Sequence, residues 1–136
     1  MVRFCVVIFL ILSASCKSTK EISTITFGSG GGFAGSFQAY QLDRSGDLAK
    51  ISLDETKGES FKTLNKPLTT QIFNNVKLFG IDTMNYNNPQ NLYYFIKYKN
   101  GNDSNYVSWS GKPTGTLVSV HSIYQLLMSQ TKSAVR

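Results

Sequence analysis

The hydrophobic periodicity of the chain changes along its length, and the order of these changes limits the possible folds more than any other feature. Alternating apolar residues, typical of strands, occur in five segments: 22–27, 33–42, 48–53, 92–99 and 106–109. Apolar residues recur at steps of three and four, as in amphipathic helices, in two segments: 68–79 and 117–129. The sequence therefore predicts the order βββ-α-ββ-α.

Strands that are grouped before each helix, rather than alternating singly with helices, favour an antiparallel sheet. We therefore expect an α+β fold in which a sheet of about five strands carries two helices packed on one face. Pro67 and Gly80 suit the start and the end of the first helix, and Thr116 suits the N-cap of the second. The opposite face of the sheet is then open to water or to a partner.

The N-terminal segment has the layout of a secretory signal. Arg3 is followed by an unbroken apolar run from Phe4 to Leu12 and then by small residues up to Cys16. A helix of this length covers only about half of the ~30 Å hydrocarbon core of a membrane, so the run is too short for a transmembrane anchor. We therefore exclude residues 1–15 from the folded domain.

The sequence Ser13-Ala14-Ser15-Cys16 resembles the lipobox of bacterial lipoproteins. The resemblance implies cleavage directly before Cys16 and lipidation of its thiol, which would attach the protein to a membrane. Lys17 follows the cysteine, where an Asp would imply retention in the inner membrane, so the resemblance favours the outer membrane of a bacterial cell envelope. The alternative is a soluble secreted protein that is cleaved nearby, in which Cys16 is a free thiol.

In the lipoprotein interpretation the chain has four parts. They are a signal peptide at 1–15, lipidated Cys16 with a short tether at 16–21, one α+β domain at 22–130 and a C-terminal tail at 131–136. No repeat and no second hydrophobic block is visible, and the length suits one domain.

Few residues of the mature chain suit catalysis or metal binding. In the lipoprotein interpretation Cys5 would leave with the signal and Cys16 would carry lipid, so no thiol would remain for a disulfide, a metal or a nucleophile. His121 is the single histidine, whereas zinc sites and acyl-transfer triads need several converging groups. We expect His121 to be partly buried with a hydrogen-bond partner. We therefore predict a protein that is not an enzyme and that has no metal and no cofactor.

The positive charge of the chain is scattered. The formal net charge is +6, yet only Lys97 and Lys99 alternate on one predicted strand, and no basic stripe with interleaved aromatic residues occurs. Nucleic-acid-binding domains concentrate such charge on one face or helix. The pattern therefore predicts no nucleic-acid partner.

The stretch FGSGGGFAGSFQAY, from Phe27 to Tyr40, contains five of the eleven glycines. Segment 30–35 matches the letters GxGxxG, but a dinucleotide site needs a helix after the glycines, and the following residues alternate like a strand. We interpret residues 28–32 as a flexible hairpin loop. Glycines also allow a partner's backbone to approach closely, so four residues are candidate contacts: Gly30, Gly31, Gly32 and Phe33.

Residues Gly31, Gly32, Phe33 and Ala34 resemble a Gly-Gly-Phe-Ala stretch near the start of the domain in the emfourin family of small bacterial inhibitors. That family inhibits metalloproteases of the thermolysin type. The resemblance implies an inhibitory role in which the glycine-rich loop contacts the protease.

Aromatic residues are concentrated between residues 86 and 109, and Tyr93, Tyr98 and Trp109 are candidate partner contacts. Exposed aromatic rings beside Lys97 and Lys99 suit recognition of a protein or a glycan. The alternative is a central strand whose aromatic residues form ordinary cross-strand pairs. We expect a non-catalytic envelope lipoprotein that acts as a binding or assembly module; the alternative function is inhibition of a metalloprotease.

Overall fold

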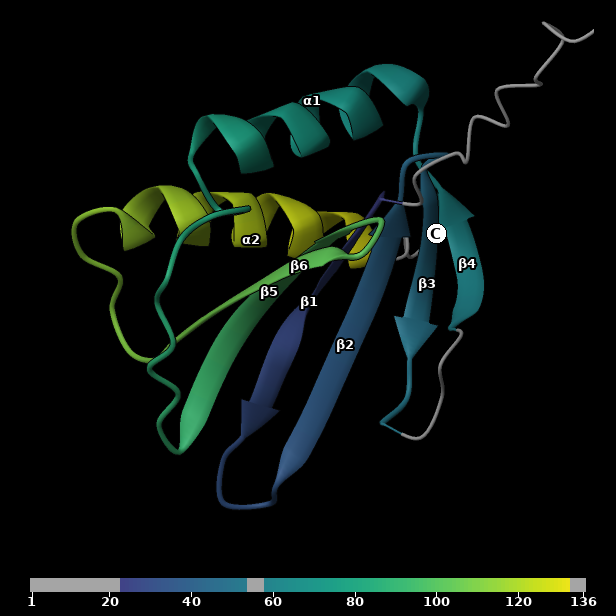
Figure 1. Ribbon diagram of the computed structural model, residues 1–136. Coiled ribbons are helices and arrows are strands. Elements are labelled where there is room, and N and C mark those ends of the chain that lie inside the picture. Colours follow the sequence, from purple (N-terminus) through teal and green to yellow (C-terminus); the bar gives the residue numbers. More distant parts are fainter. Residues whose placement is uncertain (1–22, 54–57, 133–136) are drawn as a thin grey trace, which may run out of the picture.

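The computed structural model describes residues 23–53 and 58–132 (Figure 1). The expected signal peptide, lipidated Cys16 and tether, together with most of the C-terminal tail, lie outside the described residues. Eight helices and strands follow one another along the described chain: β1 Ser23–Gly31, β2 Ser36–Asp43, β3 Asp47–Ile51, β4 Glu59–Thr63, α1 Lys66–Leu78, β5 Leu92–Asn100, β6 Asp103–Trp109 and α2 Leu117–Thr131.

The strands form one antiparallel sheet in the order β4-β3-β2-β1-β5-β6. The α+β class and the antiparallel sheet are confirmed. The expected order of elements was incomplete, because β4 adds a sixth strand between β3 and α1. Its sequence, ESFKT, contains a single large apolar residue, and most of its side chains are exposed at the sheet edge. An edge strand of this kind lacks the alternation that marks half-buried strands.

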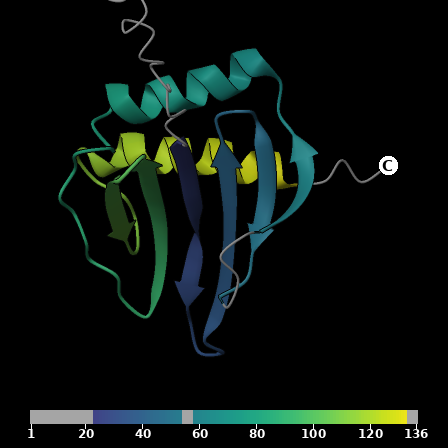
Figure 2. The ribbon, with the colours of Figure 1, turned by 45° about the vertical axis from the view of Figure 1, so that its right-hand side comes forward.

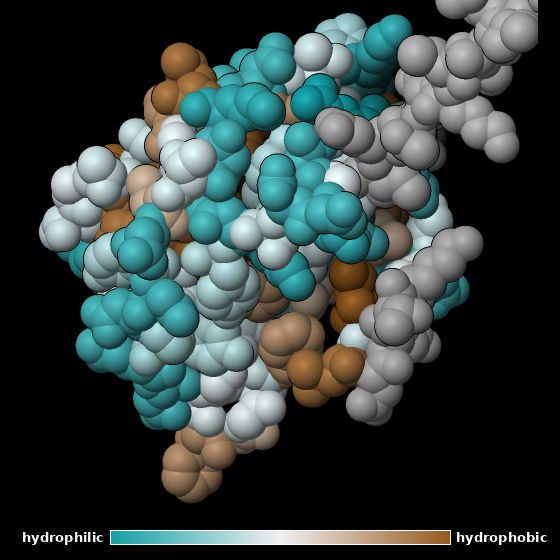
Figure 3. All heavy atoms as spheres, in the orientation of Figure 1, coloured by the Kyte–Doolittle hydropathy of each residue, from teal (hydrophilic) through white to brown (hydrophobic). Residues whose placement is uncertain are grey.

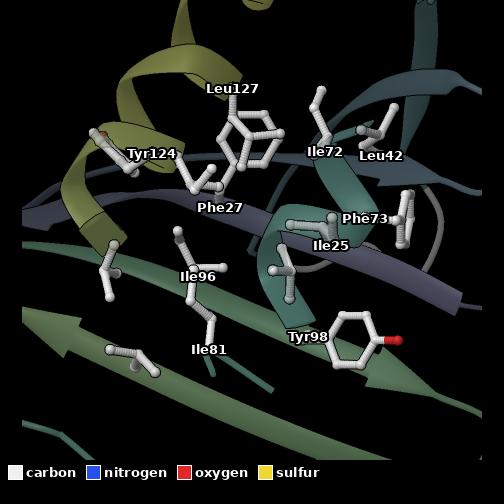
Figure 4. Packing of buried hydrophobic residues seen from close by; sticks show 14 of the residues in the cluster. Ile25, Phe27, Leu42, Ile72, Phe73, Ile81, Ile96, Tyr98, Tyr124 and Leu127 are labelled. Carbon is white, nitrogen blue, oxygen red and sulfur yellow. The ribbon is translucent and has the colours of Figure 1, made fainter. Parts of the chain in front are cut away.

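Both helices cover the same face of the sheet, as Figures 1 and 2 show from two directions. Their buried residues, which include Phe73 of α1 and Leu127 of α2, join one hydrophobic core with Ile25 and Phe27 of β1 (Figure 4). Burial of apolar side chains of this size contributes about 1.5–3 kcal/mol each. We call this covered face the helix face and the other one the open face.

Local signals set the ends of α1. The side chain of Asn65 caps the helix by accepting a hydrogen bond from the Leu68 N–H at 2.9 Å. At the other end the Gly80 N–H donates to the Lys77 carbonyl at 3.0 Å and the Ile81 N–H donates to the Val76 carbonyl at 2.9 Å, which is a Schellman motif. Gly80 therefore has the predicted C-terminal role.

The start of α2 differs from the prediction. Thr116 is the N-cap residue by position, but its side chain makes no capping hydrogen bond. Instead, turn hydrogen bonds join the Leu117 N–H to the Thr114 carbonyl and the Val118 N–H to the Gly115 carbonyl, both at 3.2 Å. Neither described helix has the length and the apolar character of a transmembrane span.

The β1–β2 hairpin extends past the helices at the lower end of the sheet (Figure 1). β1 is paired along its length with β2 and with β5, so its glycine-rich second half lies between two strands. The predicted loop at residues 28–32 is therefore wrong for Gly28 to Gly31, which are strand residues. The turn consists of residues 32–35.

Candidate functional site

Four aromatic side chains gather on the open face, and we call them the open-face cluster: Phe37, Tyr93, Phe95 and Tyr106. The Phe95 ring lies in their middle, with centroid distances of 5.9 Å to Phe37, 6.4 Å to Tyr93 and 5.7 Å to Tyr106. The rings come from β2, β5 and β6, so the cluster crosses β1 without a side chain from that strand.

Glycines of β1 make room for the cluster. Gly30 pairs with Phe37 on one side and with Tyr93 on the other. A Cβ atom on Gly30 would lie 2.5 Å from the Tyr93 hydroxyl oxygen, so the Tyr93 ring occupies the space that a side chain would need. Absence of a side chain therefore allows aromatic residues two strands apart to meet over the backbone.

The centre of the cluster is buried and its rim is exposed. Phe95 is only 4% exposed, whereas Tyr106 is 40% exposed and the other two rings are half-buried. Burial, with a contribution from neighbouring Tyr93, raises the pKa of Tyr106 above its ordinary value, and a hydrogen bond with Ser108 opposes the shift. The raised pKa keeps the Tyr106 hydroxyl neutral near physiological pH.

Two cations adjoin the cluster. Lys97 pairs with Tyr106 across β5 and β6, and Lys99 follows two residues later on the same face. Both side chains are exposed. The aromatic rim and the two lysines together offer apolar contact, hydroxyl groups and positive charge. This combination suits binding rather than catalysis.

The hairpin tip is a second exposed feature. The Gly35 N–H donates to the Gly32 carbonyl at 3.0 Å, and the Gly32 N–H donates to the Asn91 carbonyl at 2.6 Å, so hydrogen bonds hold both sides of the turn. Phe33 between them is as exposed as in an extended peptide, at 109%. Figure 3 shows the hydrophobic atoms that project from this end of the molecule.

The structure separates the predicted contact residues. Tyr93 belongs to the open-face cluster and Phe33 to the hairpin tip, whereas Gly30 and Gly31 lie inside β1. Tyr98 and Trp109 point to the helix face, where they are 5% and 0% exposed. Neither residue therefore belongs to the open face, because their positions on β5 and β6 have the opposite orientation to that of Tyr93.

Three residues of the cluster were missed by sequence reasoning. Tyr93 and Phe95 share one face of a strand by simple alternation, and that signal was visible. Phe37 and Tyr106 join them only through the register in which Phe37 pairs with Gly30 and Tyr106 with Lys97. Register depends on pairing between distant segments, which alternation alone does not specify.

His121 lies on the helix face among aromatic rings. Its centroid is 5.9 Å from Trp109 and 6.0 Å from both Tyr94 and Tyr124. The residue is half-buried, but its Nδ1 atom is buried and has no hydrogen-bond partner among residues 23–53 and 58–132, unlike the expected arrangement. In the part of the chain that the structure describes, no three His, Cys, Asp or Glu side chains are grouped as metal ligands would be.

Comparison with known proteins adds no family. No protein-family model matches the chain, and no curated protein matches it in sequence. The candidate site is therefore defined by its geometry: the open-face cluster with its lysines, and the hairpin tip.

Proposed function

We propose that the protein is a non-catalytic lipoprotein of the bacterial cell envelope and acts as a binding module, which recognises a protein partner through its open face. The observation that carries the proposal is the exposed rim of the open-face cluster, where Tyr106 and its neighbours adjoin Lys97 and Lys99. Tyrosine and phenylalanine are enriched at protein interfaces, since they combine a large apolar area with few rotatable bonds.

The proposed anchor suits this role. A tether at residues 16–21 would lead to β1 at Ser23, which pairs with Asn100 at one end of β5, whereas Gly31 pairs with Leu92 at the other end. Nine strand residues span about 30 Å, so the hairpin tip would lie that far from the point where the tether enters the domain. Lipidation of Cys16 would therefore leave the open face and the tip accessible to a partner.

The test is an affinity measurement with matched variants. Partners captured on the purified protein from detergent-solubilised native membranes would be identified, and their dissociation constants measured for Tyr106→Ala, Lys97→Ala and Leu78→Ala. Leu78 is an exposed apolar residue of α1, on the other side of the molecule, and serves as the control. We expect Tyr106→Ala to weaken binding about tenfold or more, as for a partly buried interface aromatic, and Leu78→Ala to have no effect.

Equal affinities of Tyr106→Ala and the unchanged protein for every captured protein would contradict the proposal. Binding of an envelope polysaccharide that depends on the same tyrosine, with no protein captured, would replace the protein partner with a glycan. Loss of membrane attachment in Cys16→Ala tests the lipid anchor separately from the partner.

A second candidate function is inhibition of a thermolysin-type metalloprotease, and the exposure of Phe33 at the hairpin tip favours it. A projecting apolar side chain on a hydrogen-bonded turn suits insertion into a specificity pocket of a protease. The test is inhibition of such proteases by the protein and by Phe33→Ala, with Phe61→Ala, another exposed phenylalanine, as the control. Absence of inhibition by the unchanged protein would eliminate this candidate.

A further inference from the structure

A polar pocket of about 280 Å³ lies at the end of the sheet opposite the hairpin tip. Its lining comes from three parts of the chain that are distant in sequence: the last turn of α1, the segment after it, and the β5–β6 hairpin. Neither the open-face cluster nor the tip contributes to it. The pocket is therefore a second site, independent of the proposed partner surface.

The wall of the pocket is held in place by hydrogen bonds. The Schellman motif fixes the chain that leaves α1, and the Asn105 side-chain amide then donates to the carbonyls of Ile81 at 2.6 Å and Met84 at 2.9 Å. These bonds attach the segment containing Asp82 to β6. Asp82 is thereby positioned before any ligand arrives, which lowers the entropy cost of binding.

Charges of both signs line the pocket. Lys77 of α1 supplies an ammonium group, and Asp82 and Asp103 supply carboxylates. Within the residues that the structure describes, no ion pair joins them at 4.0 Å or less. Both kinds of charge are therefore available to groups of opposite sign on a ligand.

Tyr98 adds a buried polar group to the lining of the pocket. The residue lines the pocket and is 95% buried, since only 5% of it is exposed, and its hydroxyl has no hydrogen-bond partner in the described structure. Figure 4 shows the hydroxyl oxygen on the side of the ring away from the labelled core residues. Buried hydroxyl groups nearly always have a hydrogen-bond partner, so the Tyr98 hydroxyl is a polar group of the lining that is available to a ligand.

We infer that this pocket binds a small diamino carboxylic acid, of which lysine is the simplest test case. The carboxylates of Asp82 and Asp103 would each accept hydrogen bonds from a ligand ammonium group, and Lys77 would pair with the ligand carboxylate. The pocket carries one excess negative charge, which matches the excess positive charge of such a ligand. A pocket near the lower size limit of ligand sites suits a molecule of this size.

Other ligand classes fit the lining less well. A divalent cation prefers several carboxylates, whereas only two are present and Lys77 would repel the ion. A diamine has no carboxylate to pair with the Lys77 ammonium group. An amino acid with a single ammonium group leaves one of the two aspartates without a charged partner. The same chemistry occurs in a free amino acid and in the terminal residue of a peptide, so the test includes both.

The experiment is a titration of the isotope-labelled protein, followed by the NMR shifts of its backbone amides. The probes are L-lysine, norleucine, 1,5-diaminopentane, calcium chloride and a dipeptide ending in lysine. We expect saturable shifts with L-lysine, confined to segments 77–83 and 98–105, and affinity at least about tenfold higher than for norleucine or the diamine. If the dipeptide binds with higher affinity than L-lysine, the natural ligand is the end of a peptide. If it binds with lower affinity, the natural ligand is a free amino acid.

Three variants complete the test. Asp103→Asn should weaken L-lysine binding about tenfold, since it removes one charged hydrogen bond at an exposed position. Glu59→Gln, which removes the same charge on β4, should leave the affinity unchanged. Tyr98→Phe should weaken binding without lowering the free energy of unfolding, because the lost hydroxyl has no protein partner. Absence of saturable shifts with L-lysine, equal shifts with calcium alone, or equal weakening by Glu59→Gln would overturn the inference.

Discussion

Aromatic rings pack on both faces of the sheet, but they are covered in different ways. On the helix face, α2 covers Trp109, whose ring lies 5.5 Å from Tyr124 and which is completely buried. On the open face no helix of the described residues covers Phe95, which is buried by neighbouring rings over the glycines of β1. A buried aromatic residue therefore need not belong to the main core, and rings that bury one another leave an exposed rim.

The largest expected effect is on the helix face. Replacing Trp109 by Ala removes the largest fully buried side chain and leaves a cavity beneath α2, so we expect the free energy of unfolding to fall by about 3–5 kcal/mol. Urea unfolding followed by circular dichroism measures this loss, with Leu78→Ala as the exposed control. A loss below about 1 kcal/mol would show that α2 is not packed on this face as described.

A smaller effect is expected from filling the glycine gap on the open face. In Gly30→Ala the new methyl group would displace the Tyr93 ring, at a cost of about 1–3 kcal/mol. In a Tyr93→Ala background the same substitution should cost nothing, since alanine suits a strand better than glycine does. Unfolding of the four proteins gives the coupling energy between the two sites. Additive effects would mean that the Tyr93 ring does not lie over Gly30.

The pH dependence of stability provides a test on both faces. Burial raises the pKa of Tyr106 on the open face and of Tyr124 on the helix face, where a hydrogen bond with Ser29 opposes the shift. As the pH rises, the two hydroxyls lose their protons in the unfolded chain before they do so in the folded protein. The two tyrosines therefore leave the free energy of unfolding unchanged below about pH 10, and they lower it as the pH rises from there through their pKa values in the folded protein. Tyr124→Phe and Tyr106→Phe should each make the fall less steep. Unchanged slopes in alkaline urea titrations of both variants would contradict these shifts.

The smallest effect on stability is expected at the hairpin tip. Phe33→Ser removes a side chain that contacts no core residue, so the midpoint of urea unfolding should not move. The same variant should lose any inhibition of a protease that the unchanged protein shows. A marked shift of the midpoint would mean that Phe33 packs against the protein in solution, and the tip would then no longer be a free contact.

Much of the fold follows from local signals in the sequence. The helix segments 68–79 and 117–129 overlap α1 and α2 because apolar residues at helical spacing form one buried stripe, and Gly80 ends α1 as expected. β4 escaped prediction because an exposed edge strand needs no alternation. The glycines of β1 were assigned to a loop because local preference favours turns, and pairing on both sides overrides that preference.

The candidate site was less predictable than the fold. Alternation along β5 places Tyr93 and Phe95 on the opposite face from Tyr98, but it does not show which set faces the helices. Trp109 was grouped with surface tyrosines because aromatic residues near one another in sequence were treated as one surface. Strand pairing and helix placement, which depend on contacts between distant segments, decide the two faces.

The proposed function depends on the open face being the binding surface. A photo-crosslinking amino acid placed at position 106 on this face, and in separate variants at positions 37 and 78, tests it in the native host. We expect crosslinks to the same partner from positions 106 and 37 and none from position 78 on α1. Crosslinks from position 78 alone, or from none of the three in a folded and membrane-attached protein, would contradict it.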